Sequence, residues 1–125
     1  MKGRSFLYGE KMEDKEIAFV KECIRREDLH SFYNSQKWKR LRRKVLQMDR
    51  YECQICKTRG TYTKATTVHH VNYVKQHPEL ALEIFYSWQG NQKRNLLSLC
   101  HDCHEEIHGH RKKSLALPLT EERWE

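Results

Sequence analysis

Residues 95–108 read NLLSLCHDCHEEIH, and this stretch decides the fold. Its apolar part, residues 96–100, predicts a short strand, and residues 102–108 predict a helix that ends at Gly109. The stretch also holds a Cys-x-x-Cys pair and several histidines, which are residue types that ligate transition metals. It therefore predicts a strand followed at once by a helix that carries ligands for metal ions.

The ligands on this helix fall into two groups. His104 and His108 are four residues apart, so their side chains share one face of the helix and are spaced for joint ligation of a metal ion. Cys103 points in a different direction around the helix axis. An ion held by the cysteines and an ion held by the histidines would therefore occupy different faces of one small unit.

A second Cys-x-x-Cys pair, Cys53 and Cys56, repeats the spacing of Cys100 and Cys103. Two residues between the thiolates let both sulfurs of a tight turn reach one ion, and two such pairs complete the tetrahedral four-thiolate site of structural zinc. A lone pair of this kind would suit a redox motif, but two pairs in a basic chain favour zinc. The remaining cysteine, Cys23, is then a small apolar residue on a buried helix face.

The composition limits the classes of protein that fit. The chain has 125 residues, of which 38% are hydrophobic and 33% are charged, so the core must be small and a bound metal would help to hold one fold. No stretch approaches the roughly 20 apolar residues of a membrane span, which excludes an integral membrane protein. The first residues lack the apolar run of a signal peptide, so we expect an intracellular protein with reduced cysteines.

The positive charge is concentrated in residues 34–64, which hold 10 basic and 2 acidic side chains, whereas the net charge of the whole chain is +7. Within this region residues 35–49 predict a helix capped by Asn34 or Ser35. Its apolar positions, spaced three and four apart, are Trp38, Leu41, Val45 and Met48. A nucleic acid is the expected partner of such a basic helix, and a solvated basic face is the alternative. The residues expected to contact phosphates are Lys39, Arg40, Arg42, Arg43 and Lys44.

Other segments complete the predicted organisation. Residues 13–27 predict an amphipathic helix, whose apolar face holds Ile17, Val20, Cys23 and Ile24. Residues 30–33 predict a loop. Residues 78–88 predict a short helix that starts at a proline and ends before Gly90. The expected fold class is a small, metal-stabilised α+β domain.

The segment 61–71 is rich in β-branched residues and predicts a strand or hairpin. His69 and His70 are adjacent in it. Because successive side chains of a strand point to opposite faces, these two histidines cannot do the same job.

The pair His69–His70, then Asn95, then His104 resembles the HNH endonuclease family, and the two Cys-x-x-Cys pairs interleaved with them make the resemblance specific. Residues 32–110 are similar to the small phage and prophage HNH proteins, which are often encoded beside DNA-packaging genes. The resemblance implies a ββα-metal core, in which two strands and a helix surround one catalytic ion, with a four-cysteine zinc site and flanking helices. Residues 1–31 would form an N-terminal helical extension, and residues 111–125 a C-terminal tail.

The resemblance also implies a role for each histidine of the set. His69 and His104 would bind the catalytic ion, and His108 would be a third ligand or a phosphate contact. His70 would be the general base that activates water, a task that suits imidazole near neutral pH.

The family's asparagine is assigned to Asn95, which would hold the segment that bears His70 through hydrogen bonds. Asn95 is favoured because it directly precedes the strand that leads into the helix. The long stretch before it leaves Asn72 and Asn91 as alternatives.

These roles imply a metal-dependent endonuclease that hydrolyses phosphodiester bonds of double-stranded DNA in the host cytoplasm. One such site cuts one strand, so a monomer should nick, and with little sequence readout. Imidazole ligands favour Mn²⁺, Ni²⁺ or Zn²⁺ over Mg²⁺, which prefers oxygen ligands. The four thiolates would hold a separate structural Zn²⁺.

Two other interpretations stay open at this stage. One is a non-catalytic zinc module that only binds nucleic acid, which would give His70 no task. The other is an assembly factor for phage DNA packaging, for which the helical extension and the tail would dock onto terminase or portal proteins.

Overall fold

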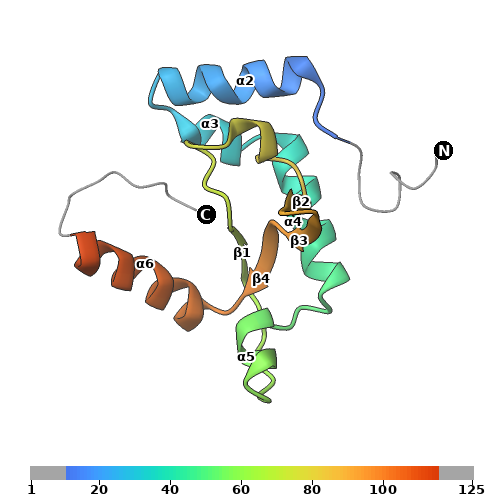
Figure 1. Ribbon diagram of the computed structural model, residues 1–125, viewed down its shortest axis with the longest axis vertical. Helices are drawn as coiled ribbons and strands as arrows, with labels where there is room; N and C mark the ends of the chain where they lie inside the picture. The colour runs from blue at the N-terminus through green and yellow to red at the C-terminus, as the bar shows by residue number, and fades with distance from the viewer. Residues whose placement is uncertain (1–10, 116–125) are drawn as a thin grey trace.

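The computed structural model describes the backbone of residues 11–115 and the side chains of residues 11–108. At its centre, β1 (Thr67–His70) pairs antiparallel with β4 (Leu96–Leu99), and α6 (His101–Leu115) follows β4 directly (Figure 1). His70 lies opposite Leu96 in this pairing. The predicted α+β class and the strand-to-helix unit are confirmed. The helix does not end at Gly109 as predicted, because a single glycine lowers helix stability without ending a helix.

The basic helix α4 (Gln36–Met48) lies on the other side of this sheet from α6 (Figure 1). Ser35 caps it, with its side chain accepting a hydrogen bond from the backbone N–H of Trp38. Trp38, Val45 and Leu46 are buried against the strands, whereas Met48, expected on the apolar face, is 39% exposed. Hydrophobic burial of this one stripe fixes α4 on the sheet.

The N-terminal helix α2 (Asp14–Arg25) begins with a capping box formed by Glu13 and Glu16. Val20 and Cys23 are buried from it and belong to the same core cluster as Trp38. The predicted helix at 13–27 and its apolar face are confirmed, and this helix is part of the core.

Residues 29–33, where a loop was expected, form the short helix α3 (Leu29–Tyr33), so that prediction was wrong. Asp28 caps α3 by accepting a hydrogen bond from the backbone N–H of Ser31. Phe32 is buried and packs against Trp38 at 5.6 Å between ring centroids. The predicted domain boundary at residue 31 falls inside this helix.

The predicted helix over 78–88 was also wrong. Only Pro78–Leu80 form a 3-10 turn, η1, and the aromatic run Phe85–Trp88 forms β2, which pairs with β3 (Asn91–Arg94). Gln89 and Gly90 join the strands with φ values of 51° and 79°. Two successive positive φ values are the geometry of the tight hairpin turn, and aromatic residues favour strands once a partner strand is present.

The strand expected over 61–71 is confined to β1, and residues 61–66 are irregular apart from a β-bridge between Glu52 and Lys64. Before them lies α5 (Gln54–Thr58), with Cys53 at its N-cap. Among the described residues, no helix has both the length and the apolar character needed to cross a bilayer.

Candidate metal centres and active site

The four predicted zinc ligands come together at the junction of α5, β4 and α6. The Sγ atoms of Cys53, Cys56, Cys100 and Cys103 all lie within 4.8 Å of one another. Sγ of Cys56 lies 3.9 Å from Sγ of Cys100 and 3.7 Å from Sγ of Cys103. Four thiolates placed tetrahedrally about 2.3 Å from Zn²⁺ are about 3.8 Å apart, so this spacing fits a zinc ion.

Each Cys-x-x-Cys turn also directs a backbone donor at sulfur. The N–H of Cys56 points at Sγ of Cys53, and the N–H of Cys103 points at Sγ of Cys100. Burial raises the pKa of Cys103, while burial of Cys53 is outweighed by backbone N–H groups that lower its pKa to about 7. Buried thiols of this kind stay ionised together only around a cation, which again fits zinc.

The second cluster joins β1 to α6. One ring nitrogen from each of His69, His104 and His108 lies within 4.8 Å of the other two. Nε2 of His104 and Nε2 of His108 are 3.2 Å apart, close to the roughly 3.3 Å expected for two imidazole nitrogens on one tetrahedral ion. His69 and His104 are buried and His108 is half-buried. Burial lowers the pKa of His104, which keeps its ring in the neutral form that ligates metals.

A cavity of about 330 Å³ opens beside this cluster and is lined by His69, Val71, Asn72, Tyr73, Gln76 and His77. The ring of Tyr73 also approaches the rings of His69 and His108, at 6.2 Å between centroids in both cases. Sequence reasoning did not single out Tyr73 or His77. Nothing in their spacing indicates that the loop after β1 folds back along the histidines.

His70 does not join the cluster. It points to the opposite face of the sheet, where its ring stacks on Trp38 at 4.8 Å between centroids. Its Nε2 lies 2.9 Å from the carbonyl oxygen of Ala81, so Nε2–H is the donor and Nδ1 carries the lone pair. Burial lowers the pKa of His70 to about 4. The expectation that His69 and His70 face opposite sides is confirmed.

Asn95, between β3 and β4, is fully buried and uses both ends of its side-chain amide. Its Nδ2 donates to the carbonyl oxygens of Leu80 and Glu83, at 2.9 Å each. Its Oδ1 accepts from the backbone N–H of Asn72 at 3.0 Å, and its own carbonyl accepts from the N–H of Val71 at 2.7 Å. Asn95 thus fastens the chain that follows His70. Of the alternative asparagines, Asn72 is its partner and Asn91 is an exposed residue at the start of β3.

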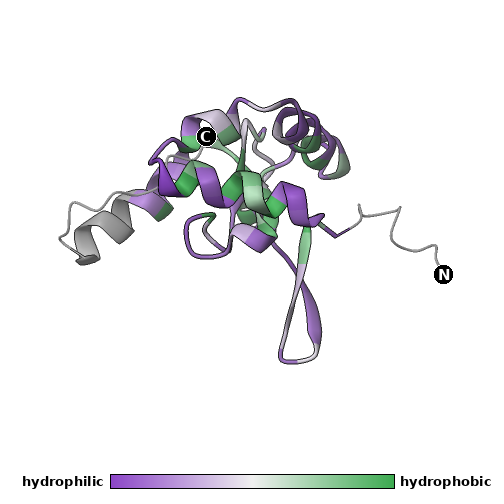
Figure 2. Cartoon of the chain, turned by 90° about the horizontal axis from the view of Figure 1, so that it is seen from above, coloured by the Kyte–Doolittle hydropathy of each residue, from purple (hydrophilic) through white to green (hydrophobic). Residues whose placement is uncertain are grey.

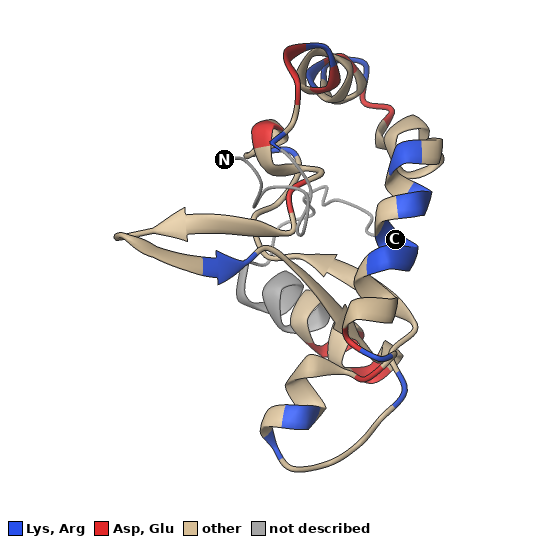
Figure 3. Ribbon diagram, turned by 90° about the vertical axis from the view of Figure 1, so that its right-hand side faces the viewer, with Lys and Arg blue, Asp and Glu red and all other residues tan. Residues whose placement is uncertain are grey.

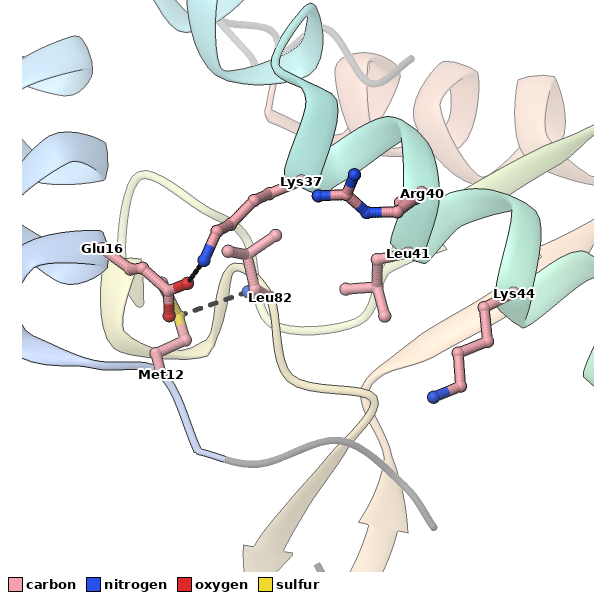
Figure 4. Close-up of a pocket in the computed structure, with 7 residues that line it drawn as sticks. All are labelled: Met12, Glu16, Lys37, Arg40, Leu41, Lys44 and Leu82. Carbon is pink, nitrogen blue, oxygen red and sulfur yellow. Dashed lines mark hydrogen bonds and ion pairs between the residues drawn. The ribbon is translucent and has the colours of Figure 1, made fainter. Parts of the chain in front are cut away.

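The basic residues of α4 do not face the histidine cluster. Because His70 packs on α4 and the neighbouring His69 packs on α6, the sheet separates the two helices (Figure 1), and Figure 3 shows the Lys and Arg residues along α4. Arg42 donates to the carbonyl oxygen of Thr66. Arg40 and Lys44 line a cavity of about 510 Å³ with Lys37, which is paired with Glu16 (Figure 4).

The comparisons with known proteins came out as follows. Neither the family models nor the curated proteins contain a match to this chain. A solved structure, the HNH endonuclease of the deep-sea thermophilic bacteriophage GVE2 with manganese ion, is similar, with 28% sequence identity and a TM-score of 0.58. The similarity covers 82% of this chain and 98% of that chain. It confirms the predicted resemblance to HNH endonucleases, and with it the fold and the enzyme class, a phosphodiester hydrolase.

Proposed function

We propose that this protein is a metal-dependent endonuclease that hydrolyses phosphodiester bonds of double-stranded DNA and cuts one strand at a time. The observation that supports this most directly is the cluster of His69, His104 and His108 beside an open cavity, in a chain whose fold matches an HNH endonuclease. One such cluster serves one strand, so nicking by a monomer is the expected reaction.

The histidine cluster is proposed to hold Mn²⁺, Ni²⁺ or Zn²⁺ in preference to Mg²⁺, since its ligands are neutral nitrogens. Such an ion, when bound, neutralises charge on the scissile phosphate and on the departing oxygen. The four cysteines are proposed to hold a separate structural Zn²⁺, because their closed set leaves no position for substrate.

We keep His70 as the proposed proton acceptor. The Ala81 carbonyl fixes the tautomer that leaves the lone pair on Nδ1, and the low pKa keeps the ring neutral at physiological pH. The ring is enclosed on the face of the sheet opposite the histidine cluster, so this role requires a rearrangement on DNA binding that brings Nδ1 to the attacking water. Asn95 is proposed as a positioning residue, because its hydrogen bonds hold the segment after His70.

The remaining proposals rest on the resemblance alone. They are an origin in a phage or prophage, action in the host cytoplasm, and association with terminase or portal proteins during DNA packaging. Phosphate contacts by the basic residues of α4 also stay a prediction, and they would lie on the far side of the sheet from the histidine cluster.

The test is a supercoiled-plasmid assay with the full chain in separate reactions with Mg²⁺, Mn²⁺, Ni²⁺ and Zn²⁺. We expect nicked circles with Mn²⁺ or Ni²⁺, a rate more than about a hundredfold lower for His104→Ala, and an unchanged rate for His101→Ala. His101 is the matched control because it is an exposed histidine on the same helix. Equal rates for the wild type and His104→Ala would contradict the catalytic proposal, and full activity with Mg²⁺ alone would contradict the ligand assignment.

A non-catalytic nucleic-acid-binding module is the second candidate, and the enclosure of His70 away from the cluster is the observation that favours it. The two candidates differ in their response to His70→Ala. A nuclease that uses His70 as its base loses cutting while it keeps DNA binding, whereas a binding module shows no cutting in either form.

A further inference from the structure

The β2–β3 hairpin is the most protruding part of the described chain, and neither the HNH motif nor the zinc ligands use it. It extends away from the body as a narrow two-stranded ribbon (Figures 2 and 3). Every residue from Ser87 to Lys93 is exposed, including Trp88 at 54%. An aromatic ring exposed at the end of a ribbon buries little apolar area within the protein itself, so it is available for contact with a partner.

The base of the ribbon is fixed rigidly to the body. The Arg94 guanidinium forms a two-pronged pair with Asp49, at 3.1 and 2.9 Å, and donates to the carbonyl oxygen of Leu96. Phe85, opposite Arg94 in the pairing, packs against the core. The face that carries Phe85 and Arg94 is therefore turned toward the body.

The other face is set by the pairing register. Residues directly opposite each other share a face, and the faces alternate along the strands. Tyr86 pairs with Lys93, and Trp88 pairs with Asn91, so these four side chains lie on the face turned away from the body. They combine aromatic rings, an amide and a cation. The chain has no Asp or Glu between Glu83 and Asp102, so nothing on the ribbon repels a polyanion.

We propose that this ribbon enters the major groove of the duplex and gives the protein contacts to DNA outside the cleavage site. The proposal rests on the proposed function for the identity of the substrate. The major groove admits a two-stranded β-ribbon and is about 8.5 Å deep, and a strand of four residues such as β2 reaches about 13 Å. Asn91 has the amide that reads adenine, Lys93 reaches guanine or phosphate, and Trp88 supplies apolar contact.

The place of the ribbon in the chain suits this use. β3 leads through Asn95 into β4, and the carbonyl of Asn95 accepts the N–H of Val71 just after β1. The ribbon thus emerges at the end of β1 that carries His69. The sequence-based expectation of little sequence readout rested on the lack of a spare reading element, and this hairpin is such an element.

The test measures binding by fluorescence anisotropy with the full, zinc-loaded chain, in a His104→Ala background so that the DNA stays intact. We expect the triple variant Trp88→Ala, Asn91→Ala, Lys93→Gln to bind a labelled duplex at least about tenfold more weakly. Lys93→Gln alone should lower the slope of log K against log salt by about 1. Lys21→Gln, which removes an exposed lysine from α2, is the control and should bind like its parent.

The following outcomes decide the proposal. A loss for the triple variant on duplex, with little loss on single strands, supports groove insertion. Unchanged duplex affinity, or equal losses on both kinds of DNA, overturns it. If the wild type binds but never cuts, while the triple variant loses duplex binding, the proposed nuclease function fails and the ribbon proposal stands. If the wild type cuts, and the triple variant binds duplex like its parent in the His104→Ala background and cuts at the same positions when His104 is present, only the ribbon proposal fails.

Discussion

The sulfur cluster and the imidazole cluster share one helix, yet they are built differently. The sulfur cluster draws its four ligands from α5 with its N-cap and from the start of α6 with the residue before it, and three of the four cysteines are buried while Cys56 is half-buried. The imidazole cluster has three ligands and lies beside a cavity. A closed set of four ligands belongs to a structural ion, and an open set of three belongs to an ion that meets substrate. Ligand number and the neighbouring cavity, and not distance along the sequence, distinguish the two clusters.

The two clusters are also supported by different forces. Around the sulfur atoms the apolar packing is small, because only Leu99 is fully buried there and Ile55, Leu97 and Ile107 are partly exposed. An ion bound by the four cysteines would take the place of a core there. The imidazole side instead rests on the main core and on the hydrogen bonds of Asn95. The predictions below test this contrast.

The largest effect is expected from Cys103→Ser. Loss of one thiolate should remove several of the roughly 10–16 kcal/mol that structural zinc supplies to small domains, so the variant should lose zinc and cooperative unfolding. Cys23→Ala is the matched control, since Cys23 is buried in the main core. For this variant we expect full zinc content and a free energy of unfolding that is lower by about 1 kcal/mol. Thermal unfolding and metal analysis check both, and a stable zinc-free Cys103→Ser protein would contradict the structural role.

Graded addition of a chelator should separate the two clusters. We expect nicking to fall more than about a hundredfold while the circular dichroism spectrum stays unchanged, because three neutral ligands at an open cavity hold an ion less firmly than a closed set of four thiolates. Added Mn²⁺ should restore the rate. Unfolding that precedes the loss of activity would reverse the assignment of the two sites.

Asn95→Ala tests the hydrogen-bonded support of the imidazole side. The change leaves two partly buried carbonyl groups and two N–H donors of Asn72 without their partner, so we expect the free energy of unfolding to fall by about 4 kcal/mol in chemical denaturation. Asn91→Ala should change stability by less than about 0.5 kcal/mol, because Asn91 is exposed. Equal effects would remove the distinction between the two asparagines.

The smallest effect concerns pH. His70 has a pKa of about 4 in the folded state and near 6.5 when unfolded. As the pH falls from 6.5 to 4, the unfolded chain binds a proton that the folded chain excludes, so stability falls. The loss should be at most about 3 kcal/mol greater for the wild type than for His70→Phe. Urea titrations at several pH values check this, with the exposed His30→Phe as control; parallel curves for the wild type and His70→Phe would contradict the burial effect.

What the sequence could predict depended on spacing along a single element. The Cys-x-x-Cys pairs and the four-residue step from His104 to His108 are local patterns, so the four cysteines and these two histidines could be proposed from spacing alone, whereas His69 was assigned from the resemblance to HNH endonucleases. The surroundings of His70 could not, because they come from Trp38 on another helix and from the Ala81 carbonyl in a later loop.

The same limit explains the error at 85–94. Phe85 and Trp88 are three residues apart and follow a proline, which indicates a helix locally. Gln89 is an unusual residue for a position with positive φ, so the turn gives little signal. Pairing with residues 91–94 decided the outcome, and such pairing depends on residues beyond the local pattern.

Cys103 and His104 are neighbours in the chain, with α-carbons about 3.8 Å apart, yet each belongs to a different cluster. A spectroscopic probe bound at one cluster is therefore linked to the other cluster through a single peptide unit. Cobalt(II) could be exchanged into the four-cysteine site. Its visible absorption bands and its paramagnetism would then report on the binding of manganese or a phosphate group at the histidine cluster. Substrate binding at the histidine cluster could thus be followed spectroscopically without an added label.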